Sequence, residues 1–279
     1  MIKLVVDSTC NLSDDVLKQF DIRVAPISIQ FGAESYEEEI DIDRDLFYRK
    51  IDEMGIIPTT AQPTPAWYEK YYRELSEQGH KILVITITSK HSGTYDSAVL
   101  AKSMVPEAEV EVFDSLNISL GTGFMALEAA RAIEAGQELP DILNRLHEIR
   151  GRASLFFTPS TLKYLQMSGR VGKLAGVYGS LLDIKPIIGL EEGKLATRER
   201  VRTRGKATTR ILELTEENVG TSAPIHLGVV HARAEEEGRR LLEQAKARLN
   251  IKEVLFADLV ASLAVHGGPG ILMMIAYQH

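Results

Sequence analysis

Short apolar runs alternate with longer amphipathic stretches along the first half of the chain. The apolar runs are rich in β-branched residues, which predicts strands, and the stretches between them have the spacing of helices. Alternation of strands and helices is typical of a parallel sheet that is covered by helices on both faces. The expected strands are Lys3–Val6, Arg23–Gln30, Lys81–Thr86 and Glu109–Phe113, and the expected helices are Asp14–Phe20, Asp43–Met54, Pro65–Gln78, Tyr95–Ser103 and Gly121–Ala135.

The pattern changes near residue 152, which predicts two domains, residues 1–152 and 153–279. The apolar run Ile184–Leu190 and a polar strand from Leu195 flank a Glu-Glu-Gly-Lys turn, which indicates a hairpin rather than a crossover. A second, α+β domain with a mixed sheet is therefore expected. Its other expected elements are strands at Ala153–Phe157, Ile225–Val230, Glu253–Leu259 and Ile271–Tyr277, and helices at Ser160–Met167 and Arg233–Leu249.

Composition narrows the class of protein. The 279 residues carry a net charge of -7, which makes nucleic acid or an anionic membrane a poor partner. The single cysteine, Cys10, excludes an internal disulfide and a cysteine-rich metal site. No apolar run approaches the roughly 20 residues that span a bilayer, and the N-terminus does not resemble a signal peptide. We therefore expect a cytoplasmic protein without stable membrane insertion.

The richest polar phrase is the loop Ser89–Thr94, which follows a buried strand and precedes a helix. Its hydroxyl groups, its glycine and the free N–H groups of a helix N-terminus suit an anion such as a carboxylate or a phosphate. Polar clusters also follow two other strands, at Asp7–Thr9 and Asp114–Ser115, and a further cluster, Pro58–Pro65, is held extended by its prolines. For any one of these clusters taken alone, a turn or a helix cap is the more common explanation.

A second phrase, His266-Gly267-Gly268-Pro269-Gly270, joins an apolar stretch to the last expected strand. Glycines on both sides of the proline permit backbone conformations and a close ligand approach that other residues forbid. The histidine is either structural or part of a ligand site in apolar surroundings.

Charged phrases give weaker signals. The segment Tyr164–Lys173 lacks the spacing of a phosphate-binding loop and has Leu174 where a hydroxyl is needed, so a nucleotide site is rejected there. Four arginines at spacing two between Arg198 and Arg204 would line one face of a strand. They could grip phosphate groups or an acidic partner, or simply keep an edge strand solvated. The acidic run Glu34–Glu39 is expected to be solvated surface.

Together these phrases resemble the DegV family, whose members include the fatty-acid-binding subunits of bacterial fatty acid kinase. The resemblance runs in order over nearly the full length, with departures at Ala61, where the family often has serine, and at Ser168, where it often has glycine. The matching phrases are the opening Val-Asp-Ser-Thr, Thr60–Pro63, Ser92–Tyr95 with Ser97-Ala98, Phe113–Ser115, Tyr164-Leu165 with Gly169-Arg170, Ile184–Ile187, and His266 with Gly268–Gly270.

The resemblance implies a Rossmann-like α/β/α domain and a second α/β domain, with one long acyl chain buried between them. It implies that Thr60, Ser92 and His266 bind the carboxylate of the fatty acid. Gly93, next to Ser92 in its loop, would belong to the same carboxylate site. Further pocket or loop residues would be Ser8, Thr94, Ser115 and Gly268, and Arg170 and Arg202 would serve kinase docking or phosphoryl transfer.

The function expected from the resemblance is binding of a fatty acid such as palmitate or oleate, with no catalysis, cofactor or metal of the protein's own. A separate ATP-dependent kinase subunit would phosphorylate the carboxylate, giving acyl-phosphate for phospholipid synthesis. One alternative is a serine hydrolase with Ser92 as nucleophile, His266 as base and Asp7 or Asp114 as orienting acid, although the G-x-S-x-G elbow is absent. Another is an acyl carrier or lipid sensor that works without a kinase.

Overall fold

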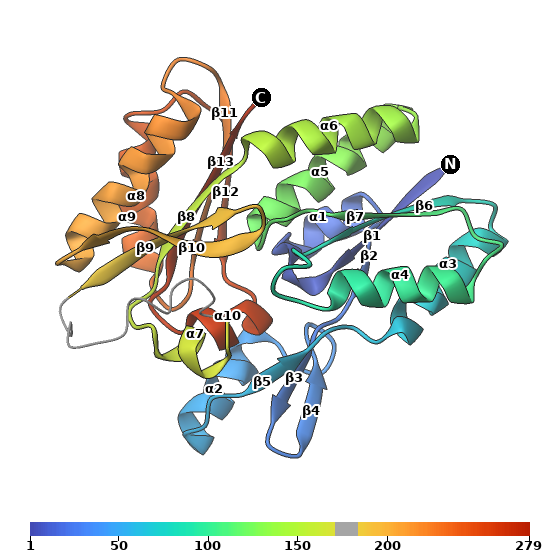
Figure 1. The fold of residues 1–279 in the computed structure, drawn as a ribbon, viewed down its shortest axis with the longest axis horizontal. Helices are drawn as coiled ribbons and strands as arrows, with labels where there is room; N and C mark the ends of the chain where they lie inside the picture. Colours follow the sequence, from blue (N-terminus) through green and yellow to red (C-terminus); the bar gives the residue numbers. More distant parts are fainter. Residues whose placement is uncertain (171–183) are drawn as a thin grey trace. The chain divides into compact units, whose positions relative to one another are not determined.

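The computed structural model describes residues 1–170 and 184–279, and the chain divides into two compact units (Figure 1). The first unit consists of Met1–Arg150 together with Val260–Ser262, and the second consists of Gly151–Leu259 together with Leu263–His279. One sheet is parallel and a second is mixed, which confirms the expected α/β fold class.

The parallel sheet belongs to the first unit and has the strand order β2-β1-β6-β7. All three neighbouring pairs are parallel, so the carboxyl ends of the strands meet at one edge of the sheet. Loops that follow β1, β6 and β7 therefore begin side by side. The strands are β1 (Ile2–Asp7), β2 (Arg23–Ala25), β6 (Lys81–Thr86) and β7 (Val110–Asp114).

Helices α3 and α4 cover the parallel sheet through one apolar cluster. Buried Tyr68 and Tyr72 of α3 and Ala98 of α4 pack in this cluster with Val5 and Val84 of the strands. Helix α5 packs against β1 and β6. The helical elements of this unit are η1 (Ser8–Cys10), α1 (Asp14–Gln19), α2 (Arg44–Met54), α3 (Pro65–Glu77), α4 (Thr94–Met104), α5 (Leu120–Glu134) and α6 (Leu139–Arg152), whose last two residues belong to the second unit.

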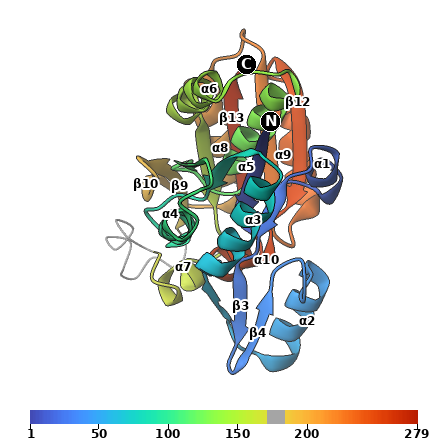
Figure 2. The same cartoon turned by 90° about the vertical axis from the view of Figure 1, so that its right-hand side faces the viewer.

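A small antiparallel sheet, in the order β4-β3-β5, completes the first unit. Figure 2 shows β3 and β4 together with α2, and the rings of Phe31 and Phe47 meet edge to face, with centroids 6.1 Å apart. The expected single strand Arg23–Gln30 is wrong. Pro26 has no N–H for a ladder, and the chain leaves one sheet there and enters the other. The strands are β3 (Ser28–Phe31), β4 (Glu34–Glu37) and β5 (Thr59–Ala61).

The second unit has a sheet in the order β10-β9-β8-β13-β11-β12. Among the described strands of this sheet, β11 and β12 pair in parallel and the other neighbours pair antiparallel. Strands β9 and β10 form the expected hairpin. The strands are β8 (Ser154–Thr158), β9 (Lys185–Glu191), β10 (Lys194–Val201), β11 (Ile225–His231), β12 (Ile251–Asp258) and β13 (Leu272–Gln278).

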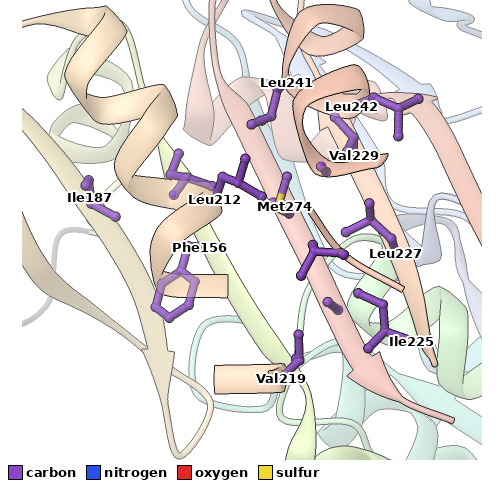
Figure 3. Close-up of a cluster of buried hydrophobic side chains, with 14 of the residues drawn as sticks. Phe156, Ile187, Leu212, Val219, Ile225, Leu227, Val229, Leu241, Leu242 and Met274 are labelled. Atoms are coloured by element: carbon purple, nitrogen blue, oxygen red, sulfur yellow. The ribbon is translucent and has the colours of Figure 1, made fainter. Parts of the chain in front are cut away.

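One hydrophobic cluster holds helices α8 and α9 on this sheet (Figure 3). Leu212 of α8 and Leu241 of α9 are buried with Leu227 of β11 and Met274 of β13. Side-chain burial of this kind is the main favourable contribution to folding. The helices are α7 (Lys163–Met167), α8 (Arg204–Val219), α9 (Glu235–Lys246) and α10 (Ala261–Gly267), the last of which begins with residues of the first unit.

Candidate functional site

The hydroxyl-rich loop between β6 and α4 forms the N-terminal end of α4. Gly93 is the N-cap residue, and Thr94 is the first residue of the helix. The Ser92 Oγ and Thr94 Oγ1 atoms are 2.7 Å apart, and the Thr94 N–H donates to Ser92 Oγ at 3.3 Å. One hydroxyl proton is used within the pair. The other remains for an acceptor such as a carboxylate oxygen.

The Thr-x-Gln-Pro segment lies next to this loop. Thr60 is in β5, and the Pro63 carbonyl that follows accepts a hydrogen bond of 2.6 Å from Ser97 Oγ of α4. The Gln62 side chain packs against Gly93. A Cβ added at Gly93 would lie 3.0 Å from Gln62 Nε2, which is closer than ordinary contact. The structure thus brings two sequence-predicted phrases together. The structure also places the Gln62 amide beside the Ser92 loop. Sequence reasoning did not single out Gln62, although it lies inside the Thr60–Pro63 segment.

Two acids at the carboxyl ends of strands hold the neighbouring loops. Asp7 Oδ2 accepts from the Ile87 N–H at 2.7 Å, and Asp7 Oδ1 accepts from both the N–H and the hydroxyl of Thr9. Asp114 Oδ1 accepts from the Ser89 N–H at 3.1 Å. Burial raises the pKa of Asp7. Both carboxyl groups are therefore engaged by the loops they support.

Ser8 and Ser115 are buried and have partners of their own. Ser8 Oγ accepts from the Ile27 N–H at 3.0 Å and donates to Glu38 Oε2 at 2.5 Å. Ser115 Oγ lies 2.9 Å from Thr122 Oγ1 of α5. These bonds connect the strand-end loops to the rest of the first unit. A pocket role for either serine stays a prediction.

The expectation that the whole acidic run Glu34–Glu39 is solvated is wrong at Glu38. This side chain is 1% exposed, although it follows an exposed hairpin strand. Its Oε1 accepts from the Ser262 N–H at 2.6 Å, and its Oε2 accepts from the hydroxyls of Ser262 and Ser8. Burial raises the pKa of Glu38 to about 7, and the neighbouring charge of Glu39 adds a smaller effect of the same sign.

His266 lies in the last turn of α10, in the second unit. The helix ends where the Gly268 N–H donates to the Ala264 carbonyl at 2.8 Å. Gly268 has a φ of +74°, the left-handed conformation that favours glycine at a helix C-terminus.

Tight packing explains the glycines that follow the histidine. A Cβ at Gly268 would be 2.3 Å from the ring of Tyr164, and a Cβ at Gly270 would be 1.9 Å from Ser160 Oγ. Both glycines also have a positive φ. The phrase after His266 is therefore a close-packed loop against the segment around α7.

The basic residues of the second unit have different environments. Arg170 is half-buried just after α7, and its Nη1 donates to the Ser168 carbonyl at 2.5 Å. Arg202 is exposed beyond the end of β10. The Val171–Leu174 part of the rejected phosphate loop lies outside the described residues.

The four arginines between Arg198 and Arg204 do not line one strand face, so that expectation is wrong. The β9–β10 pairing shifts register between Thr197 and Glu199, and β10 ends at Val201. Arg198 pairs with Glu191, with 2.8 Å between Nη1 and Oε1. Arg204 instead begins helix α8, and its guanidinium lies against the interior of the second unit.

Within residues 1–170 and 184–279, no group of three or more histidine, cysteine, aspartate or glutamate side chains could hold a metal ion. Helices in those ranges are also too short or too polar to cross a membrane.

Known proteins resemble this chain over nearly its whole length. The family model of the uncharacterised DegV family matches residues 1–278. Protein DegV of Bacillus subtilis is 34% identical over 272 residues, which are 97% of each chain. A structure described as fatty acid binding of a DegV family protein from Thermus thermophilus superposes with a TM-score of 0.94 at 32% identity, covering 100% of this chain and 99% of that one.

A stearic acid-binding protein from Eubacterium ventriosum superposes with a TM-score of 0.91 at 28% identity, covering 100% of this chain and 98% of that chain. The family model, the Bacillus relative and the two structures all extend over both units. The chain therefore belongs to the DegV family.

Proposed function

We propose that the protein binds one long-chain fatty acid, such as palmitate or oleate, and presents its carboxylate to a separate ATP-dependent kinase subunit. The observation that carries this proposal is the hydroxyl pair of Ser92 and Thr94 beside the Gln62 amide, at the N-terminus of α4. These are uncharged donors to an anion. The fatty acids bound by the Thermus and Eubacterium relatives support the ligand class.

Thr60, Ser92 and His266 take the carboxylate in this proposal, and Gly93 allows the anion to approach the loop closely. A hydrogen bond to a charged group contributes roughly 1.5–3 kcal/mol. Burial of a sixteen-carbon chain contributes roughly 0.8 kcal/mol per methylene, or about 11 kcal/mol before the costs of association. The chain therefore supplies most of the affinity, and the polar groups orient the carboxylate.

Arg170 and Arg202 serve the kinase subunit in this proposal, by docking or by contact with the phosphates. The product would be an acyl-phosphate for phospholipid synthesis. Because ATP donates the phosphoryl group, we place this reaction in the cytoplasm. The protein contributes orientation and needs no cofactor of its own.

Native mass spectrometry of the purified protein tests the ligand. A mass shift of one fatty acid, released on denaturation, or uptake of added palmitate by delipidated protein is the expected result. Protein that is empty and also refuses palmitate and oleate would rule the proposal out.

The alternatives give different outcomes. Labelling of Ser92 by a fluorophosphonate would favour a hydrolase, although Asp7 and Asp114 already accept backbone N–H groups in their own loops. Fatty acid binding without any kinase that accepts the loaded protein would favour a carrier or a lipid sensor. If Arg170→Ala and Arg202→Ala left acyl-phosphate formation unchanged, their proposed partner role would be lost.

A further inference from the structure

Arg204, the first residue of α8, connects three segments of the second unit. Its Nη2 donates to the Gly270 carbonyl at 2.5 Å, and its Nη1 donates to the Thr158 carbonyl at 3.1 Å. Its Nε donates to Glu237 Oε2 of α9 at 2.8 Å. Its side chain is only 23% exposed. These three hydrogen bonds orient the guanidinium toward groups of the protein itself. Arg204 is therefore not placed to bind a phosphate.

The segment that Arg204 holds is the loop after His266. The Gly270 N–H donates to the Ala232 carbonyl at 2.6 Å, so both sides of this residue are fixed by hydrogen bonds. Gly270 has a φ of +82°, and Ser160 Oγ occupies the space beside its Cα. The loop therefore has one well-defined path between the end of α10 and the start of β13.

A planar guanidinium is suited to this task because its N–H groups form a rigid fork that reaches two carbonyls and a carboxylate together. An ammonium group has the same charge but no fixed fork. Without Arg204, the Gly270 carbonyl would lose its charged donor. The loop could then settle in other conformations, and the histidine at its start would move with it.

We propose that Arg204 is a positioning residue for His266, which holds the Gly267–Gly270 loop so that the imidazole meets a fatty acid carboxylate in one orientation. This inference rests on the proposed fatty acid function. It assigns Arg204 a role distinct from that of the exposed Arg202, two residues before it.

The test compares palmitate with hexadecanol, which has the same chain length and no carboxylate. Wild type, Arg204→Met, Arg204→Lys and Glu237→Gln are delipidated and titrated with each ligand. Arg248→Met is the matched control, because Arg248 pairs with Glu216 in the same unit.

We expect Arg204→Met to lose about tenfold in palmitate affinity and to stay within about twofold of wild type for hexadecanol. Arg204→Lys should lie between Arg204→Met and wild type, since charge is kept and the fork is lost. Equal losses for both ligands would indicate a merely structural role and would overturn the proposal, as would unchanged binding of both. Glu237→Gln keeps the two carbonyl bonds, and should show a smaller loss confined to palmitate.

The imidazole signals of His266 in ¹H–¹⁵N NMR spectra give a readout that needs no ligand. They are assigned by their absence in His266→Gln. Arg204→Met should shift these signals, whereas Arg248→Met should not. If wild type bound no fatty acid, the proposed function would fail, while an unshifted His266 signal would overturn the positioning role separately.

Discussion

Glu38 is a carboxyl group whose burial has a cost that depends on pH. Three donors from Ser8 and Ser262 stabilise its charged form, but desolvation outweighs them and raises its pKa to about 7, from an ordinary value of 4.5. Between those two values the folded state keeps the proton that the unfolded state releases. Stability is therefore greatest below about pH 4.5 as far as this group is concerned, and it falls as the pH rises toward 7.

Glu38→Gln should remove this part of the pH dependence. For wild type, we expect the free energy of unfolding to lose up to about 3 kcal/mol through Glu38 between pH 4.5 and 7.5, and we expect a flatter profile for the variant. Urea unfolding at a series of pH values measures both. Asp7, whose pKa is also raised, contributes to both proteins and cancels in the comparison. Glu53→Gln, an exposed acid on α2, is the control.

Equal slopes for wild type and Glu38→Gln would show that Glu38 titrates normally. A control variant as flat as Glu38→Gln would show that surface charge, not this buried group, sets the slope.

Ser92→Ala should separate affinity from orientation. The variant loses one hydroxyl donor to the carboxylate, so palmitate affinity should fall by about tenfold or less. Acyl-phosphate formation with a cognate kinase should fall by about 100-fold, because a carboxylate that swings loses its alignment. Isothermal titration and a phosphoryl-transfer assay give the two numbers. Ser103→Ala, at the exposed end of α4, should change neither.

A large loss of affinity with unchanged phosphorylation would reverse this division of labour between the acyl chain and the hydroxyl group.

At the scale of elements, the approach of the β5 segment to the start of α4 depends on Gly93. Its φ of -79° is open to any residue, so the constraint is space and not backbone strain. A side chain there would have to displace the amide of Gln62, which is the far end of a flexible side chain. A methyl group at Gly93 should therefore change the stability of the fold little, but it should move the Gln62 amide.

Gly93→Ala should leave the free energy of unfolding within about 0.5 kcal/mol of wild type while weakening palmitate binding. In a Gln62→Ala background the same change should weaken binding less, since the displaced amide is gone. A double-mutant cycle on palmitate affinity measures that coupling. Gly151→Ala, which has open space around its Cβ, controls for the general effect of replacing glycine. Strictly additive effects in the cycle would contradict the contact.

Patterns in the sequence predict most elements because their signals are local. Strand β6 has the expected bounds, and Thr203 caps α8 through a bond from the Lys206 N–H. The arginine stripe predicted a strand as far as Arg204, and no element was expected over the rest of α8. Ala207, Ile211, Thr215 and Val219, which recur every four residues and are buried, are the helical signal there. No element was expected over α6 either, although buried Ile142, Leu146 and Ile149 stand at helical spacing there.

The candidate site is only partly predictable for a related reason. The Ser92 phrase and the Thr60 phrase are each local, and both were visible as hydroxyl-rich segments. Glu38 and Arg204 were not, since each resembles an ordinary surface charge until its partners are known. Ser262 lies 224 residues after Glu38, and Gly270 lies 66 residues after Arg204. A periodic pattern along the chain carries no information about such contacts.

At the scale of the whole molecule, ligand binding should appear as added stability. Palmitate at a free concentration of 100 times its Kd should add about 2.7 kcal/mol to the free energy of unfolding. Octanoate at the same concentration should add far less, because it lacks eight methylene groups of roughly 0.8 kcal/mol each. Differential scanning calorimetry of delipidated protein measures both shifts. Equal shifts for the two acids would mean that the carboxylate, and not the chain, is the recognised part.

The first unit includes residues from two separate parts of the chain, and this limits how the protein can be cut into fragments. Val260–Ser262 belong to that unit, where the Val260 N–H donates to Asn11 and Ser262 binds Glu38. A fragment that stops at Arg150 would leave both of those buried side chains without these partners. During synthesis the first unit must likewise wait for a tripeptide that is made only after Gly151–Leu259 of the second unit. The two units are thus not interchangeable modules, and any attempt to swap one between relatives must carry this tripeptide with the first.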